Sequence, residues 1–95
     1  MHCFPFSVAP NISLFDVPQL VGSGMNTTLL CVASGIPQPR ITWQRDGMIL
    51  ARVHQVTNSM FVIRNVGEAD SGLYTCVAAN VAGMSSKRGN LTIQG

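Results

Sequence analysis

Apolar and polar residues alternate along several short stretches of this chain, and turn-forming residues separate the stretches. Successive side chains of a strand point to opposite faces, so a period of two predicts strands with one buried face. Pro18 interrupts the first stretch, which is typical of an edge strand. The alternation predicts strands at residues 10–21, 27–34, 40–45, 48–50, 52–56, 59–65, 72–80 and 84–93.

Short turn signals connect the predicted strands. Asp46-Gly47 predicts a tight hairpin, Gly22-Ser23-Gly24 predicts a turn, and Gly67-Glu68-Ala69 predicts a short corner. No stretch has the period of a convincing amphipathic helix. Many short strands at regular spacing indicate an all-β sandwich.

A set of spaced residues runs through these strands in a fixed order. Cys31 is followed by Trp43, and Asp70-Ser71-Gly72-Leu73-Tyr74-Thr75-Cys76 then places a Tyr two residues before a second Cys. In these residues the chain resembles an intermediate-set (I-set) immunoglobulin domain, from about Pro10 to Gln94. The resemblance implies an immunoglobulin-like β-sandwich of two antiparallel sheets with Greek-key topology. Further matching motifs are Gly35-x-Pro37-x-Pro39, Phe61-x-Ile63-x-x-Val66 and Ala78-x-Asn80-x-x-Gly83.

The resemblance also implies roles for single residues. Cys31 and Cys76 form a disulfide between the sheets, Trp43 packs against it, and Tyr74 returns its hydroxyl to the backbone near Asp70. Asp70 is expected to pair with Arg52, and an exposed ion pair of this kind contributes about 0–1 kcal/mol. The other core positions, which the alternation places inward, are Leu29, Ile41, Phe61, Ile63 and Leu91.

Length and charge limit the classes of function. A chain of 95 residues with a net charge of +2 makes one domain, which we expect at residues 10–95, with residues 1–9 as an N-terminal extension or linker. So small a charge gives no argument for nucleic acid or a membrane surface. No apolar run approaches the roughly 18 residues of a transmembrane helix, so we expect no membrane insertion by this fragment.

The third cysteine, Cys3, is left over if Cys31 and Cys76 pair. Beside His2 it gives two ligands without a second cluster, so a free terminal thiol is favoured over a metal site. A bridge from Cys3 to a preceding domain or another chain stays open. His54 is a lone histidine, and nothing predicts a catalytic nucleophile or a phosphate-binding loop. We therefore expect no enzyme, no cofactor and no metal.

Three Asn-x-Ser/Thr sequons are candidate glycosylation sites, at Asn11, Asn26 and Asn90. About one such triplet is expected by chance in this composition, so accidental triplets are the alternative. Asn26 precedes a predicted strand and Asn90 alternates outward from Leu91, which favours exposed positions for glycans.

The outward positions suggest where a partner docks. Leu73, Val77 and Ala79 share the sheet that carries Trp43, and they are the interface candidates; Leu30 and Val32 face outward from the opposite sheet. Lys87-Arg88 with Arg40 could bind a heparan-type glycan. We favour a solvated edge instead, because a useful binding patch needs more residues of the same charge.

Two hypotheses of function follow. The first is a non-catalytic protein-interaction module of an extracellular adhesion molecule or receptor ectodomain, at the cell surface as part of a larger protein. Its partner would be another protein, a second copy of itself or neighbouring immunoglobulin domains. The alternative is a structural immunoglobulin module of an intracellular muscle or cytoskeletal scaffold, in which both cysteines stay reduced.

Overall fold

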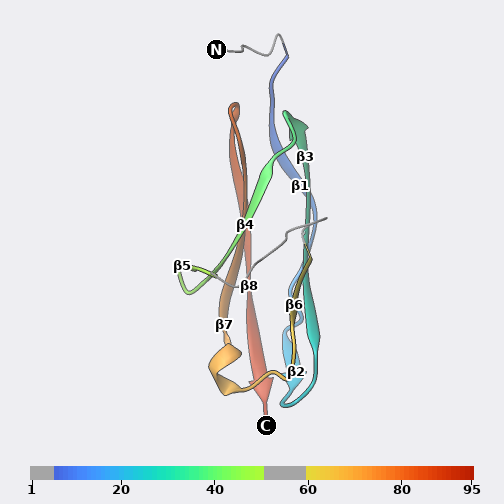
Figure 1. The fold of residues 1–95 in the computed structure, drawn as a ribbon, viewed down its shortest axis with the longest axis vertical. Helices are drawn as coiled ribbons and strands as arrows, with labels where there is room; N and C mark the ends of the chain where they lie inside the picture. The colour runs from blue at the N-terminus through green and yellow to red at the C-terminus, as the bar shows by residue number, and fades with distance from the viewer. Residues whose placement is uncertain (1–5, 51–59) are drawn as a thin grey trace.

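The computed structural model describes residues 6–50 and 60–95 and folds them into two β-sheets that face each other (Figure 1). The three-stranded sheet has the order β1-β3-β6, and the five-stranded sheet has the order β2-β8-β7-β4-β5. The predicted sandwich is confirmed, and the strand predicted at residues 52–56 lies outside the described residues. The elements are β1 Val8–Asp16, β2 Leu20–Gly22, β3 Thr27–Ile36, β4 Arg40–Arg45, β5 Met48–Ile49, β6 Met60–Ile63, the 3-10 helix η1 Glu68–Asp70, β7 Gly72–Asn80 and β8 Gly83–Gln94.

The first predicted strand is divided between the two sheets. Before Pro18, β1 pairs antiparallel with β3; after it, β2 pairs parallel with β8. The backbone N–H of Thr92 donates to the carbonyl oxygen of Gln19 at 2.9 Å, which joins the second half to β8. The break predicted at Pro18 is confirmed. The strand begins at Val8, earlier than predicted, because Val8 pairs with Ile36 at the end of β3.

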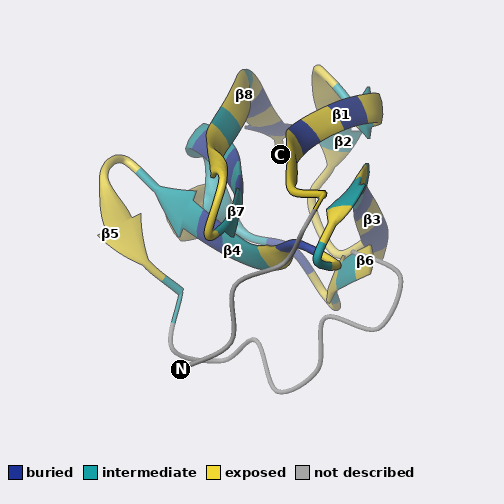
Figure 2. Ribbon diagram, turned by 90° about the horizontal axis from the view of Figure 1, so that it is seen from above, coloured by how far each residue is buried: buried dark blue, intermediate teal, exposed yellow. Residues whose placement is uncertain are grey.

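The core lies between the sheets and follows the alternation of the strands. Buried and exposed residues alternate along β1 and β3 (Figure 2). Phe15 and Phe61 both stack against the Trp43 ring, with centroids at 6.0 and 6.5 Å from it. Almost no surface remains on Leu29, Cys31, Trp43, Val66, Tyr74, Cys76 and Leu91, and Ile41, Phe61 and Ile63 pack against them partly buried.

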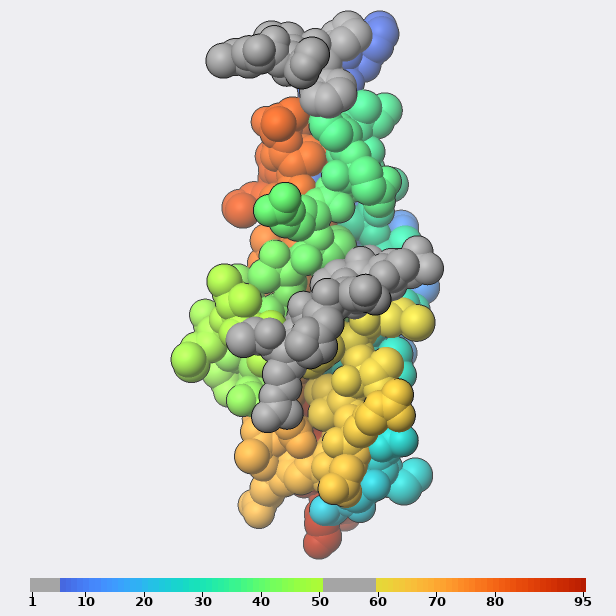
Figure 3. All heavy atoms as spheres, in the orientation of Figure 1, coloured from blue at the N-terminus to red at the C-terminus, as the bar shows by residue number. Residues whose placement is uncertain are grey.

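The β4–β5 hairpin turns on two residues, as predicted. Asp46 has φ 50° and Gly47 has φ 84°, which is the turn geometry that matches the twist of paired strands. The backbone N–H of Leu50 donates to the Trp43 carbonyl oxygen at 3.1 Å after the turn. This hairpin projects from the side of the sandwich (Figure 3).

Candidate interaction face

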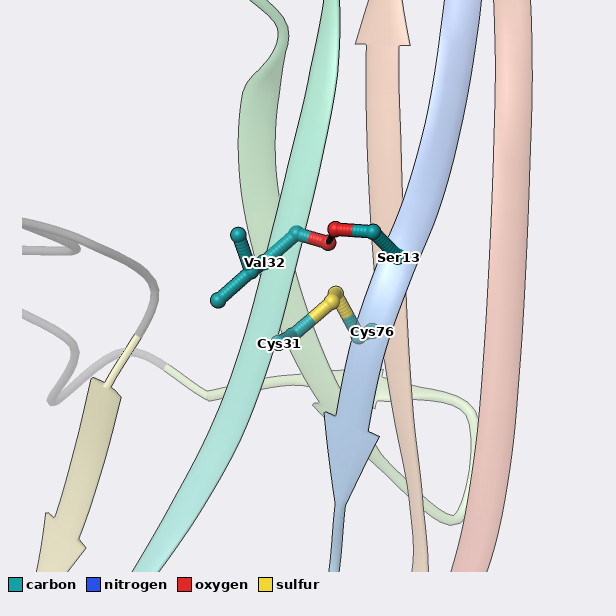
Figure 4. The surroundings of a disulfide bond; sticks show 4 residues. All are labelled: Ser13, Cys31, Val32 and Cys76. Atoms are coloured by element: carbon teal, nitrogen blue, oxygen red, sulfur yellow. Dashed lines mark hydrogen bonds between the residues drawn. A yellow bond between two sulfur atoms is a disulfide. The ribbon is translucent and has the colours of Figure 1, made fainter.

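A disulfide holds the two sheets face to face. Cys31 of β3 and Cys76 of β7 are joined, with Cα atoms 6.4 Å apart and no exposed surface (Figure 4). Trp43 lies directly across from Cys76 in the register of β4 and β7, so the indole packs beside the bridge. On the other side, Ser13 Oγ donates to the Val32 carbonyl oxygen at 3.3 Å and ties β1 to β3. The disulfide therefore holds the two sheets, and with them the two outer faces, in one relative position.

The corner before β7 is built around Tyr74. Its hydroxyl donates to the Asp70 carbonyl oxygen at 2.6 Å, and Asp70 Oδ2 accepts from the Gly67 N–H at 2.8 Å. Burial raises the pKa of the Tyr74 hydroxyl above its ordinary value, while the nearby Arg45 guanidinium acts in the opposite direction. The structure thus brings Tyr74 and the Asp70 backbone together at the position that the resemblance implied.

Asp70 lies near Arg45 in this structure. Arg45 Nη1 is 3.8 Å from Asp70 Oδ1, and both side chains are about one-third exposed. A pair in this setting contributes about 0–1 kcal/mol. The expected partner, Arg52, lies outside the described residues, and so do Cys3 and His54.

A close approach fixes the start of β7. Asp46 Oδ1 accepts from the Leu73 N–H at 2.9 Å. A Cβ atom on Gly72 would lie 2.7 Å from Asp46 Oδ2, so only glycine leaves room for this carboxylate. The hydrogen bond and the absence of a side chain on Gly72 together hold the start of β7 close to the β4–β5 turn.

The outer surface of β4, β7 and β8, which we call the five-stranded face, carries the three interface candidates. Leu73, Val77 and Ala79 all point outward from β7, and all are half-buried because β4 and β8 flank them. Their neighbours across the ladder are Asn90 beside Leu73, Thr42 and Ser86 beside Val77, and Arg40 and Met84 beside Ala79. A shallow hollow on this face is lined by Gln44, Gly47, Leu73, Thr75, Ser86, Lys87 and Arg88.

The basic residues on this face are spread out. Arg40 pairs with Ala79 and Arg88 pairs with Thr75, so the two lie on opposite sides of β7 and four residues apart along it. At a rise of about 3.3 Å per residue, that separates them by about 13 Å along the strand alone. Lys87 adjoins Arg88 at the hollow, so the face holds one basic pair and a separate Arg40 rather than a cluster of three.

All three sequon asparagines are exposed. Asn11 faces outward from β1 opposite Ser34, and Asn26 lies just before β3. Asn90 lies directly beside Leu73 on the five-stranded face. A glycan on Asn90 would therefore share that face with the interface candidates.

The sequence reasoning missed much of the opposite surface, which we call the three-stranded face. Leu14, Met60 and Val62 point outward there beside the expected Leu30 and Val32. For β6, the alternation at residues 60–63 could have predicted that Met60 and Val62 face outward. The bulge between Ile12 and Leu14 hides it for β1, because an extra residue reverses the alternation.

Neither a membrane-spanning helix nor a metal-binding group of side chains occurs in the residues that the structure describes. Within 6–50 and 60–95, no helix is both long and apolar enough to cross a bilayer. The same two ranges contain no group of three or more His, Cys, Asp or Glu side chains arranged to hold a metal ion.

Comparison with known proteins gives consistent relatives. The chain is 39% identical over 99 residues to hemicentin-1 of Mus musculus, covering 87% of this chain and 2% of that protein. Among solved structures, Drosophila OTK extracellular domains 3–5 align with a TM-score of 0.85 at 27% identity, over 94% of this chain and 33% of that one. Titin domain M7 aligns with a TM-score of 0.86 at 28% identity, over 97% of this chain and all of that one.

The chain therefore spans a small fraction of the hemicentin-1 relative and the whole of a single titin domain. The immunoglobulin domain family matches residues 9–80, which include the bridge, the Trp43 core and the Tyr74 corner. This chain belongs to the immunoglobulin domain family.

Proposed function

We propose that this chain is an I-set, non-catalytic interaction module of an extracellular adhesion molecule or receptor, and that it docks a protein through the five-stranded face. The observation that carries the proposal is the buried disulfide between the sheets. Disulfides persist in secreted and cell-surface proteins and are rare in the cytosol. The similarity to extracellular domains of OTK supports the same compartment.

The five-stranded face has the composition of a protein-binding surface. Apolar groups at Leu73, Val77 and Ala79 are bordered by polar and basic residues from β4 and β8. Interfaces that form and dissociate combine an apolar centre with a polar rim in this way. The partner would be another protein, a neighbouring immunoglobulin domain or a second copy. A heparan-type glycan is the weaker choice, because Arg40 and Arg88 are spread apart.

The alternative is a module of an intracellular scaffold. The likeness to titin domain M7, which covers the whole of that chain, favours it. The two proposals differ in their thiols, because the cytosol keeps cysteines reduced.

The compartment is tested by expressing the domain in a secretory host and counting free thiols by alkylation and mass spectrometry. One reactive thiol, on Cys3, is expected from the secreted, folded protein. Three reactive thiols in secreted protein with a native circular dichroism spectrum would contradict the extracellular proposal.

The docking face is tested with a second copy of the domain as the first probe. Leu73→Asp is expected to weaken self-association measured by sedimentation at high concentration, while Ser34→Asp, which lies on the three-stranded face and in no sequon, leaves it unchanged. The Thr92→Ala change removes the Asn90 sequon in both proteins, so that no glycan interferes. A wild-type domain that stays monomeric rules out the second copy, and equal effects of the two aspartates contradict the assignment of the face.

A further inference from the structure

The middle of the three-stranded face is apolar. The register places Leu14 opposite Val32 and Leu30 opposite Met60, so outward apolar side chains adjoin one another across all three strands. Val62 continues the row on β6, opposite Thr28. The exposed fractions are 49% for Leu14, 37% for Val32, 48% for Met60 and 44% for Val62. We call Leu14, Leu30, Val32, Met60 and Val62 the apolar strip, and a contiguous apolar surface of this kind marks a site that another group covers.

The charge around the strip argues against a charged occupant. Asp16 is the only charged residue in the whole of β1, β3 and β6. It lies opposite Leu30, at the edge of the strip. Among the described residues, a partner with charged groups would find as counter-charges only Asp16 and, directly after β6, Arg64, whereas a neutral, hydroxyl-rich polymer needs none.

Two sequons lie at the two ends of the strip. Asn11 is opposite Ser34, two residues from Val32 along β3, and Asn26 precedes Leu30 by four residues. At about 3.3 Å per residue these separations are about 7 and 13 Å. Both asparagines are exposed and both belong to the three-stranded face, while Asn90 belongs to the other face.

The amide of Asn26 is oriented for modification. Its Oδ1 accepts a hydrogen bond from the Asn65 backbone N–H at 2.9 Å. Within residues 6–50 and 60–95, no hydrogen bond uses its Nδ2, which is the atom that carries an N-linked sugar. Asn80 lies outside any sequon and uses its Nδ2 twice, in bonds to Val8 and Pro37.

We propose that Asn11 and Asn26 carry N-linked oligosaccharides and that these two glycans cover the apolar strip. In the transfer, Asn Nδ2 attacks the anomeric carbon of a lipid diphosphate-linked oligosaccharide. The new C–N bond replaces the C–O bond to the diphosphate, the amide gives up one proton, and the lipid diphosphate leaves. The Oδ1 atom of Asn26 is untouched, so its hydrogen bond to Asn65 survives. This inference rests on the secretory route of the proposed function.

The test compares glycosylated and unglycosylated protein from a secretory host. Glycopeptide mass spectrometry is expected to find both Asn11 and Asn26 occupied. The double variant Asn11→Gln/Thr28→Ala, which removes both sequons and keeps Asn26, is expected to show a severalfold rise in fluorescence of a dye that binds exposed apolar surface. It is also expected to form oligomers, and adding Val32→Lys to it should suppress both effects.

Three matched controls accompany the double variant. Ser13→Thr and Thr28→Ser keep both sequons and should behave as wild type. Thr92→Ala removes only the Asn90 sequon, on the other face, and should leave the dye signal unchanged. Enzymatic removal of the glycans from folded wild-type protein repeats the comparison without a folding step, in case a variant folds poorly.

The outcomes separate clearly. The inference is overturned if either asparagine is unoccupied, or if the unglycosylated domain shows no change in dye signal. It is also overturned if the glycosylated protein oligomerises and Val32→Lys abolishes the oligomers, because a second copy would then be the occupant of the strip. A free-thiol count on the same samples distinguishes the two proposals. One free thiol with empty sequons overturns the glycans alone, and three free thiols overturn the extracellular function.

Discussion

The two ends of the sandwich are fastened by different means. At the end where β1 begins, which we call the amide end, Asn80 Nδ2 donates to the carbonyl oxygens of Val8 at 2.8 Å and Pro37 at 2.9 Å. Its Oδ1 accepts from the Ala82 N–H at 2.8 Å. At the opposite end, the corner end, Tyr74 donates to the Asp70 carbonyl oxygen beside η1 (Figure 1).

The two fastenings differ in the span of chain that they close. The amide bonds join residues 72 and 43 positions apart, whereas the tyrosine bond spans four positions. One small side chain at the amide end therefore holds three segments that meet only in the folded state. The corner end is a local turn that also benefits from neighbouring β-sheet contacts. We expect the amide end to be the more sensitive to substitution.

The largest effect is expected from Asn80→Ala. The change removes two donated bonds and one accepted bond, and it leaves the part-buried carbonyl oxygen of Pro37 without its partner, while the groups of Val8 and Ala82 are exposed. The free energy of unfolding should fall by about 1–2 kcal/mol, since the unmet Pro37 carbonyl oxygen costs about 1 kcal/mol or more and the two exposed bonds contribute less. Urea unfolding at neutral pH measures the change.

Asn80→Asp is the matched control for the amide end. A carboxylate still accepts from Ala82 N–H but cannot donate to the two carbonyl oxygens, so this variant should be as unstable as Asn80→Ala at neutral pH. A protonated carboxyl can donate once, so part of the stability should return on acidification. A loss below about 0.5 kcal/mol in both variants would show that water replaces the amide.

A smaller effect is expected at the corner end from Tyr74→Phe. The ring stays in place and only the hydrogen bond to Asp70 is lost. The free energy of unfolding should fall by about 1 kcal/mol, which is the usual net contribution of one such bond. The same urea titration gives the value, and a loss as large as that of Asn80→Ala would invalidate the comparison of the ends.

The contrast between the ends also explains what the sequence could predict. The corner follows from Tyr74 and Cys76 because a short motif specifies a local structure, and the strands follow from alternation. The bonds of Asn80 to Val8 and Pro37 depend on how loops distant in sequence meet, and no spacing encodes that. The proximity of Arg45 to Asp70 was missed for the same reason, as was the width of the apolar strip, which depends on the register between β1, β3 and β6.

The ionisation of Tyr74 tests the corner by another route. Burial raises its pKa in the folded state above the unfolded value of 10.0. The folded state therefore holds the proton more tightly, and the stability that this contributes is present below pH 10 and lost as pH rises through the folded pKa. The stability difference between wild type and Tyr74→Phe should shrink in that alkaline range.

Tyr74 is the only tyrosine in the chain, so its phenolate absorbance reports the ionisation without ambiguity. The midpoint in the folded protein should lie above that of the protein unfolded in urea. Equal midpoints would show that the hydroxyl is not shielded and would remove the basis for the alkaline effect.

The smallest effect on stability is expected from Arg45→Gln at the corner end. Its distance of 3.8 Å from Asp70 and the partial exposure of both groups limit the loss to about 0–1 kcal/mol, decreasing further in salt. The effect on Tyr74 is more specific. The Arg45 guanidinium favours the phenolate, so its removal should raise the pKa of Tyr74 further.

Absorbance titration of Arg45→Gln against wild type measures that change, with Arg40→Gln as the control because Arg40 pairs with Ala79, five residues from Tyr74 along β7. A rise in the Tyr74 midpoint in Arg45→Gln alone would mean that Arg45 lies close to the hydroxyl in solution as it does here. A midpoint that falls, or that moves equally in both variants, would mean that only the overall charge acts on Tyr74. In that case the corner end would be held by the hydrogen bond to Asp70 without help from its charges, and the difference between the two ends would be sharper still.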